Sequence, residues 1–171
     1  MIRVMLVDDQ ELVRSGFRII LESEPDIEVV CEAPDGEAAI ALAAEHTPDV
    51  ICMDVEMPRL DGISASRRIL ATQPDTSVLI LTTFGHEHYL FDALAAGVSG
   101  FLLKTSRAEQ LIDAVRNALA ARADVDERSM FGCYCFFVDG KLCIGVKGEE
   151  LLLRLPPERH AEFQELQNTR E

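Results

Sequence analysis

The chain has 171 residues, 48% of them hydrophobic and 27% charged, a balance typical of a folded globular protein rather than a disordered one. Its formal net charge of -14 argues against an extensive nucleic-acid-binding surface, because phosphate contacts require clustered Lys and Arg. No apolar stretch approaches the ~18 residues of a membrane-spanning helix, and no signal peptide is evident at the N-terminus, so we expect a cytoplasmic protein without a membrane partner.

Residues 1 to about 121 alternate short apolar runs with longer amphipathic segments. The runs are rich in Val, Ile and Leu and nearly continuous, as in strands that are buried on both faces. The predicted strands are Ile2–Val7, Ile27–Ala33, Val50–Met53, Val78–Thr82 and Gly100–Leu103. The predicted helices are Glu11–Glu22, Glu37–Glu45, Ile63–Ala71, Glu87–Ala96 and Ala108–Ala121, and Ser106 with Glu109 predicts a capping box at the start of the last one.

Five strand–helix units in succession predict an α/β fold with one parallel sheet and helices on both of its faces. Five strands of this kind fit the flavodoxin-like doubly wound arrangement, with strand order 2-1-3-4-5. We therefore expect one complete (βα)5 domain over residues 1–121.

The composition changes after residue 121. Three apolar runs, Met130–Val138, Leu142–Val146 and Leu151–Leu155, are separated by turn signals such as Asp139-Gly140. Pro156 and Pro157 then favour the start of a helix, where a missing N–H costs little. Residues 122–171 are thus predicted to form a second, smaller module, an antiparallel β-meander with a terminal helix.

Three acidic residues stand where strands of the first domain end. Asp8 and Asp9 follow the first predicted strand, and Asp54 follows the third. Because the carboxyl ends of parallel strands meet at one edge of a sheet, the three carboxylates should lie close together. They would repel one another unless a hard divalent cation neutralised them, which predicts a Mg²⁺ site with one carboxylate free for chemistry. Taken singly, each acid would be better interpreted as a solvated loop residue, and only the ordered set favours the metal site.

Residues 1–121 resemble a response-regulator receiver domain, particularly of the NarL/FixJ type. The matching segments occur in the same order and at the same spacing as in that family. They are Val7–Glu11, Met53–Gly62, Leu81–Phe84 and Gly97–Lys104.

The resemblance implies that Asp54 accepts a phosphoryl group from a histidine kinase. It implies that Asp9 binds Mg²⁺ directly, that Asp8 acts mostly through a metal-bound water, and that the backbone carbonyl of Glu56 completes the protein ligands. Catalysis in such a domain is limited to its own phosphorylation and dephosphorylation, so we do not expect an enzyme in the usual sense.

The resemblance also assigns roles around the phosphate. Lys104 and Thr82 would contact phosphoryl oxygens, as a point charge and a hydroxyl donor. Thr82 would then move toward the phosphate and Phe101 would rotate inward, with an ordinary core aromatic as the less favoured interpretation of Phe101. Glu56 and Phe84 occupy positions that tune the lifetime of the phosphate in this family, in a direction that the sequence leaves open.

Two other groups of residues invite a metal interpretation. His86-Glu87-His88 lacks the H-E-x-x-H spacing, and residues two apart on a helix point away from each other, which favours a solvated helix start. Cys133, Cys135 and Cys143 fall on neighbouring predicted strands, where a metal or redox cluster and a patch of small core residues are both open.

The second module resembles the start of a TfoX N-terminal domain. The matching segments are Met130–Gly132, Phe137–Val146, Glu150–Arg154 and Pro157–Arg159. No helix-turn-helix is predicted, so direct DNA binding is not expected, and the helix Leu111–Ala121 lies where that family has its first helix.

The pattern as a whole predicts a phosphorylation-controlled response regulator of a two-component system. It would act on an unidentified output protein, with indirect control of transcription as one route. A homodimer could form through the fourth helix, fifth strand and fifth helix, or through the meander. The alternative is a TfoX-like interaction protein whose receiver is vestigial and never phosphorylated.

Overall fold

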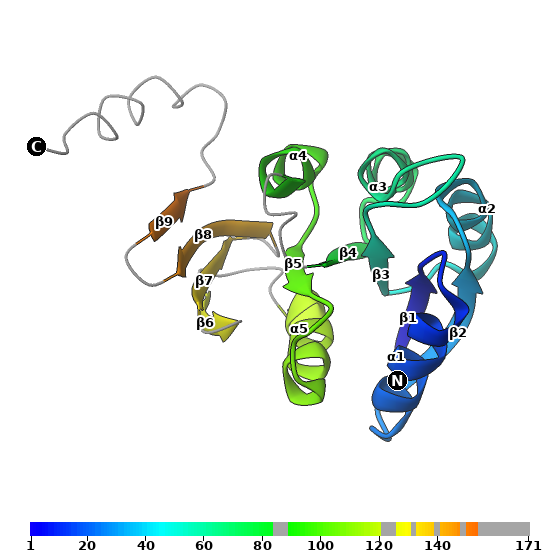
Figure 1. Cartoon of the computed structure of the whole chain (residues 1–171), viewed down its shortest axis with the longest axis horizontal. Coiled ribbons are helices and arrows are strands. Elements are labelled where there is room, and N and C mark those ends of the chain that lie inside the picture. The colour runs from blue at the N-terminus through cyan, green and yellow to red at the C-terminus, as the bar shows by residue number, and fades with distance from the viewer. Residues whose placement is uncertain (84–88, 121–125, 131–132, 139–140, 148–149, 154–171) are drawn as a thin grey trace, which may run out of the picture.

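The structure is a computed structural model that describes residues 1–83, 89–120, 126–130, 133–138, 141–147 and 150–153. Among the helices in these ranges, none is both long and apolar enough to cross a bilayer. Figure 1 shows the order of the elements along the chain.

Ten elements alternate between strand and helix from residue 2 to residue 120. They are β1 (Ile2–Val7), α1 (Glu11–Glu22), β2 (Ile27–Ala33), α2 (Gly36–His46), β3 (Val50–Asp54), α3 (Gly62–Thr72), β4 (Ser77–Thr82), α4 (Tyr89–Ala96), β5 (Gly100–Leu103) and α5 (Ala108–Ala120). The five strands form one parallel sheet in the order β2-β1-β3-β4-β5. The predicted fold and strand order are confirmed.

The sheet is the middle of three layers, with α1 and α5 on one face and α2, α3 and α4 on the other (Figure 1). Alternate residues of the central strands supply the two cores. Val4 and Leu6 pack with Leu21 and Val115 on the first face, whereas Met5 packs toward the helices of the second face. Strands covered on both sides explain the nearly continuous apolar runs in the sequence.

The start of α5 differs from the predicted capping box. The helix begins at Ala108, as expected, but the side chain that reaches back belongs to Gln110, whose Oε1 accepts a hydrogen bond from the Arg107 N–H at 2.9 Å. The Ser106 N–H instead donates to the Leu103 carbonyl at 3.0 Å. The Ser106–Glu109 box was therefore wrong by one residue, because the turn after β5 uses Ser106 to reverse the chain.

Four further strands follow in the second part of the chain: β6 (Asp126–Met130), β7 (Cys133–Val138), β8 (Lys141–Lys147) and β9 (Glu150–Leu153). They pair antiparallel in the order β6-β7-β8-β9. The helix expected from Pro156 and the boundary expected near residue 122 lie outside the described residues.

The loop between β3 and α3 is packed so tightly that it requires glycine at its end. A Cβ on Gly62, the first residue of α3, would lie 1.7 Å from the Asp54 carbonyl oxygen. The Gly62 N–H donates to the Val55 carbonyl at 2.9 Å, which closes the loop onto the end of β3. Gly16, in the middle of α1, has open space around the same position.

These two glycines make a matched pair for a stability test. We expect Gly62→Ala to lower the free energy of unfolding by at least about 2 kcal/mol, because backbone must move to admit the methyl group. Gly16→Ala should raise it by up to about 1 kcal/mol through helix propensity. Urea denaturation measures both, and equal stabilities of the two variants would contradict the close approach at Gly62.

Candidate functional site

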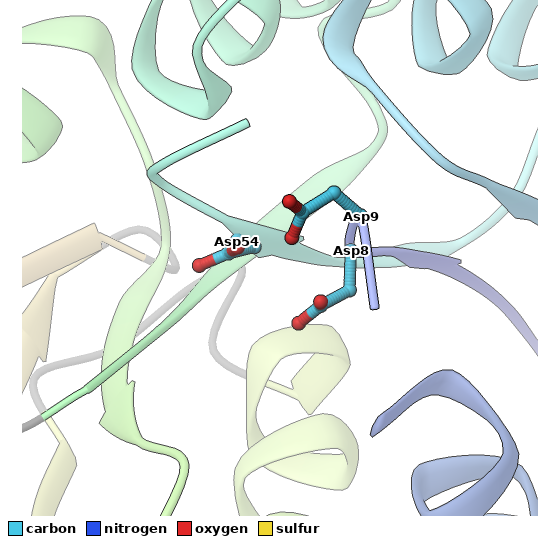
Figure 2. A group of neighbouring side chains, drawn as sticks. All are labelled: Asp8, Asp9 and Asp54. Atoms are coloured by element: carbon cyan, nitrogen blue, oxygen red, sulfur yellow. The ribbon is translucent and has the colours of Figure 1, made fainter. Parts of the chain in front are cut away.

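The candidate site lies at the carboxyl edge of the parallel sheet, where four strands end. Asp8 and Asp9 follow β1, and Asp54 is the last residue of β3. Thr82 is the last residue of β4, and Lys104 follows β5 directly. Figure 2 shows the three carboxylates together at the ends of β1 and β3. The structure therefore brings the predicted acidic residues to one edge.

The three carboxylates are close enough to share one cation. One oxygen from each of Asp8, Asp9 and Asp54 lies within 4.8 Å of the others. Asp8 and Asp54 are 3% and 6% exposed, whereas Asp9 is exposed. At this separation each pair of negative charges costs about 3 kcal/mol at an effective dielectric constant of ~20. The group thus carries a strong electrostatic demand for positive charge.

Lys104 meets part of that demand. Its Nζ lies 2.6 Å from Asp8 Oδ2 and 3.1 Å from Asp54 Oδ1, in a position where the lysine side chain is 12% exposed. Burial alone would lower the pKa of Lys104, but the hydrogen bond to Asp8 and the charge of Asp54 outweigh it and raise that pKa. Among the described side chains of the site, three carboxylates and one ammonium leave two negative charges uncompensated, which matches a divalent cation.

Backbone groups orient the two buried carboxylates. The Val55 N–H donates to Asp54 Oδ1 at 2.8 Å, and the Gln10 N–H donates to Asp8 Oδ1 at 2.9 Å. Desolvation raises the pKa of Asp54 to about 6, and the charge of Asp8 adds to that rise while Lys104 opposes it. Near neutral pH Asp54 is thus ionised but held in an environment that disfavours its charge.

Thr82 and Phe101 stand on the two neighbouring strands. Thr82 is 1% exposed, and its Oγ1 is buried without a hydrogen-bond partner among the described residues. Phe101, on β5, is half-buried and packs against the cores on both faces of the sheet. A buried hydroxyl without a partner at this edge is suited to an oxygen-bearing ligand, since leaving it unpaired costs free energy.

The β3–α3 loop is fixed on the side of α2. The Arg59 guanidinium hydrogen-bonds Asp35, whose other carboxylate oxygen accepts from the Ala38 N–H at 2.9 Å and caps α2. The Gly36 N–H also donates to the Leu60 carbonyl at 3.2 Å. Arg59 adopts φ 67, a conformation that the ion pair helps to hold.

On its other side the loop contacts α4. The Tyr89 hydroxyl donates a hydrogen bond to Glu56 Oε1 at 3.2 Å. Sequence reasoning missed this contact and the Arg59–Asp35 pair because each joins residues far apart in the chain. The role predicted for the Glu56 carbonyl as a metal ligand stays a prediction.

Some predicted features lie outside the described part of the chain. Phe84 and the His86-Glu87-His88 segment fall in the gap before α4. The backbone of Cys133, Cys135 and Cys143 belongs to β7 and β8, but their side chains are not described, so the question of a cysteine metal site stays open as predicted.

The donor set fits a hard divalent cation. All three converging groups are carboxylates, the ligands that Mg²⁺ and Ca²⁺ prefer, and an octahedral Mg²⁺ shell filled partly by water needs few protein ligands. The Thr82 hydroxyl, which has no hydrogen-bond partner among the described residues, suits an anion bound beside such a cation, and so does the Lys104 ammonium next to the carboxylates. The site is therefore equipped to hold a metal and an oxyanion together.

Comparison with protein families gives two matches that together span most of the chain. Residues 4–116 match the response regulator receiver domain, and residues 117–170 match the TfoX N-terminal domain. Both resemblances seen in the sequence are confirmed.

Individual relatives agree with the first match. The chain is 50% identical over 122 residues to the transcriptional regulatory protein YxjL of Bacillus subtilis, covering 71% of this chain and 56% of that protein. It is 45% identical over 118 residues to LiaR of the same organism, covering 69% and 56%. The chain thus spans little more than half the length of these relatives.

A solved structure shows the same fold. The signal receiver domain of a response regulator, NarL, from Mycobacterium tuberculosis superposes with a TM-score of 0.67 at 34% identity, covering 71% of this chain and 98% of that one.

The raised pKa of Asp54 has a consequence for stability. The folded state binds the Asp54 proton more tightly than the unfolded chain does, so ionising this carboxyl costs folding free energy as pH rises from about 4 to 6. We expect metal-free Asp54→Asn to be more stable than the unaltered chain at pH 7.5, by about 1–2 kcal/mol after solvent screening. The difference should shrink toward pH 4.5. Urea denaturation at both pH values measures it, and a difference independent of pH would contradict the burial of this charge.

Proposed function

Since the chain belongs to the response regulator receiver family, we propose that it is a phosphorylation-controlled switch in which Asp54 accepts a phosphoryl group from a histidine kinase. The observation that carries this proposal is the contact of one ammonium, Lys104, with both Asp8 and Asp54, at the point where three carboxylates gather. That arrangement supplies an acceptor oxygen and a positive charge in one place.

Mg²⁺ is the proposed cofactor. Asp9 and Asp8 would hold it, with Asp54 and the Glu56 carbonyl as the further protein ligands. When bound, it would neutralise charge on the transferring phosphoryl group, which is most of what catalysis of this reaction needs. Asp9, as the exposed carboxylate of the three, is the one most accessible to an incoming hydrated ion.

Three protein side chains take part in the phosphoryl transfer itself: Asp54, Lys104 and Thr82. In the transfer, an oxygen of the ionised Asp54 carboxylate forms the new bond to phosphorus while the bond to the kinase histidine nitrogen breaks. Lys104 already lies 3.1 Å from Asp54 Oδ1 and would neutralise a phosphoryl oxygen there. The buried Thr82 hydroxyl would gain a hydrogen-bond partner, which it does not have within the described part of the chain.

The same contacts suggest how the switch is read. A Thr82 hydroxyl drawn toward a phosphate would change the packing around Phe101, which touches both cores.

Residues 1–121 would be the receiver and residues 122–171 the TfoX-like module, in a cytoplasmic protein. The output would pass by protein contact through α4, β5 and α5, or through a homodimer. The names of YxjL and LiaR favour transcription as the process controlled, reached here through a partner rather than by direct DNA binding.

A vestigial receiver is the less favoured alternative. A receiver that is never phosphorylated would not need its acidic residues to lie together. The structure nevertheless has five polar residues at one edge of the sheet, with the lysine paired to two of the acids: Asp8, Asp9, Asp54, Thr82 and Lys104. Buried like charges destabilise a fold, so the presence of these carboxylates is better explained by a role in metal binding and phosphorylation.

Phosphorylation by a small donor tests the proposal directly. Incubation with acetyl phosphate and Mg²⁺ should add a single phosphoryl group, detected by intact-protein mass spectrometry, and EDTA should abolish the addition. Asp54→Asn should abolish it as well, because the acceptor oxygen is lost.

Asp113→Asn is the matched control, because Asp113 is an exposed carboxylate on α5 outside the site. It should be labelled as efficiently as the unaltered chain. Equal labelling of the Asp54→Asn variant would refute the assignment, and no labelling of the unaltered chain would favour the vestigial alternative.

A further inference from the structure

Arg14, on α1, reaches back to the turn that carries two of the three carboxylates. Its Nη1 donates a hydrogen bond to the Asp8 carbonyl oxygen at 2.7 Å. The Nε of the same guanidinium donates to Glu32 Oε2, on β2, at 3.0 Å. The Arg14 side chain is only 14% exposed, so solvent weakens these contacts less than it weakens an exposed ion pair.

The Asp8 carbonyl belongs to the peptide unit that joins two of the proposed metal ligands, Asp8 and Asp9. A peptide unit is planar, so holding its carbonyl oxygen also sets the direction of the bond that leads to the Asp9 Cα. The Asp8 N–H donates to the Ala33 carbonyl of β2 at 3.1 Å. Asp8 is thus held on one side by β2 and on the other by Arg14, next to an exposed Asp9 (Figure 2).

Glu32 determines where the Arg14 guanidinium lies. Its Oε2 accepts from Arg14, and its Oε1 accepts from the Arg18 Nε at 2.6 Å. Burial alone would raise the pKa of Glu32, but the hydrogen bonds from Arg18 and Arg14 outweigh it and lower that pKa. Both arginines therefore tie α1 to an ionised carboxylate on β2. Arg14 continues to the Asp8 carbonyl, whereas Arg18 continues to the Val29 carbonyl at 3.3 Å.

The charge of Arg14 does not explain its place beside a cation site. A guanidinium repels a nearby cation, and the Glu32 carboxylate offsets that repulsion only in part. What Arg14 contacts at the site is a neutral carbonyl oxygen, so its contribution there is to geometry.

We propose that Arg14 is a positioning residue for the metal site, whose guanidinium fixes the Asp8–Asp9 peptide unit and so sets the two carboxylates for a divalent cation. This inference rests on the proposed function, in which the cation is Mg²⁺. Mg²⁺ demands near-ideal octahedral geometry, whereas Ca²⁺ accepts a flexible shell of oxygen ligands. Loss of the positioning contact should therefore affect Mg²⁺ more than Ca²⁺.

Arg14→Met tests the proposal by the sign of its effect. Met keeps an unbranched stem that suits a helix and removes every donor. Because a positive charge near the site is lost, electrostatics alone would tighten cation binding. Positioning predicts the opposite: the dissociation constant for Mg²⁺, measured by isothermal titration calorimetry, should rise about three- to tenfold, and that for Ca²⁺ should rise less. Unchanged or tighter Mg²⁺ binding, or equal losses for the two ions, would overturn the proposal.

Arg18→Met is the matched control. It removes the same charge from the same helix and breaks the other hydrogen bond to Glu32, while the Arg14 contact with the Asp8 carbonyl stays in place. Its dissociation constant for Mg²⁺ should stay within about twofold of the value for the unaltered chain. A loss as large as in Arg14→Met would show that looser packing of α1 on β2 is responsible, and would overturn the proposal.

Arg14→Lys separates geometry from charge and retains the net charge of the fold. A single ammonium lacks the two separate donors, Nε and Nη1, that Arg14 directs at Glu32 and at Asp8. Mg²⁺ binding should therefore weaken in this variant too. Full affinity in Arg14→Lys would contradict a role for the guanidinium.

The hydrogen bond itself can be followed in the metal-free chain by nuclear magnetic resonance. Arg14→Met should shift the carbon-13 resonance of the Asp8 carbonyl, and Arg18→Met should leave it in place. An Asp8 resonance that ignores Arg14→Met would overturn the proposal. Failure of the unaltered chain to bind Mg²⁺ would instead refute the proposed metal site, whereas normal Mg²⁺ binding in both the unaltered chain and Arg14→Met would refute this inference alone.

Discussion

The repulsion among Asp8, Asp9 and Asp54 is the constraint on which the rest of the site depends. Three carboxylates within 4.8 Å would separate in a flexible chain, but two strands with fully buried interiors hold them in place. Residues such as Val4, Val50 and Ile51 are 0% exposed, and their burial anchors the strand ends. Hydrophobic free energy in the two cores thus maintains a charge arrangement that is unfavourable in itself.

Lys104 reduces the repulsion among the three carboxylates but neutralises only one of their negative charges. Its ammonium contacts Asp8 and Asp54, and the hydrogen bond from its own backbone N–H to the Thr82 carbonyl at 2.7 Å fixes the turn that carries it. The site therefore combines partial neutralisation of charge with a buried hydroxyl, that of Thr82, which finds no hydrogen-bond partner in the part of the chain that the structure describes. Both features would be satisfied by a divalent cation and a phosphoryl group together, which is the basis of the proposed function.

Much of this was predictable from the sequence, because a strand buried on both faces leaves a continuous apolar run that ends where polar residues begin. That signal located Asp8 and Asp9 after β1 and Asp54 at the end of β3, and the order of the strands followed from topology. Local capping was less predictable: Gln110 rather than Glu109 completes the start of α5, since the preceding turn shifted the helix cap by one residue. Contacts between distant segments, such as Arg59 with Asp35 and Tyr89 with Glu56, left no local pattern to find.

Whether Asp54 is the Mg²⁺-dependent phosphoacceptor is best measured in a structure of the chain with Mg²⁺ and beryllofluoride, a stable mimic of a bound phosphoryl group. We expect beryllium bonded to an Asp54 carboxylate oxygen, Mg²⁺ held by Asp8 and Asp9, and fluorines in contact with Lys104 and the Thr82 hydroxyl. Beryllofluoride absent from Asp54 at saturating Mg²⁺, or bound at a different residue, would contradict it.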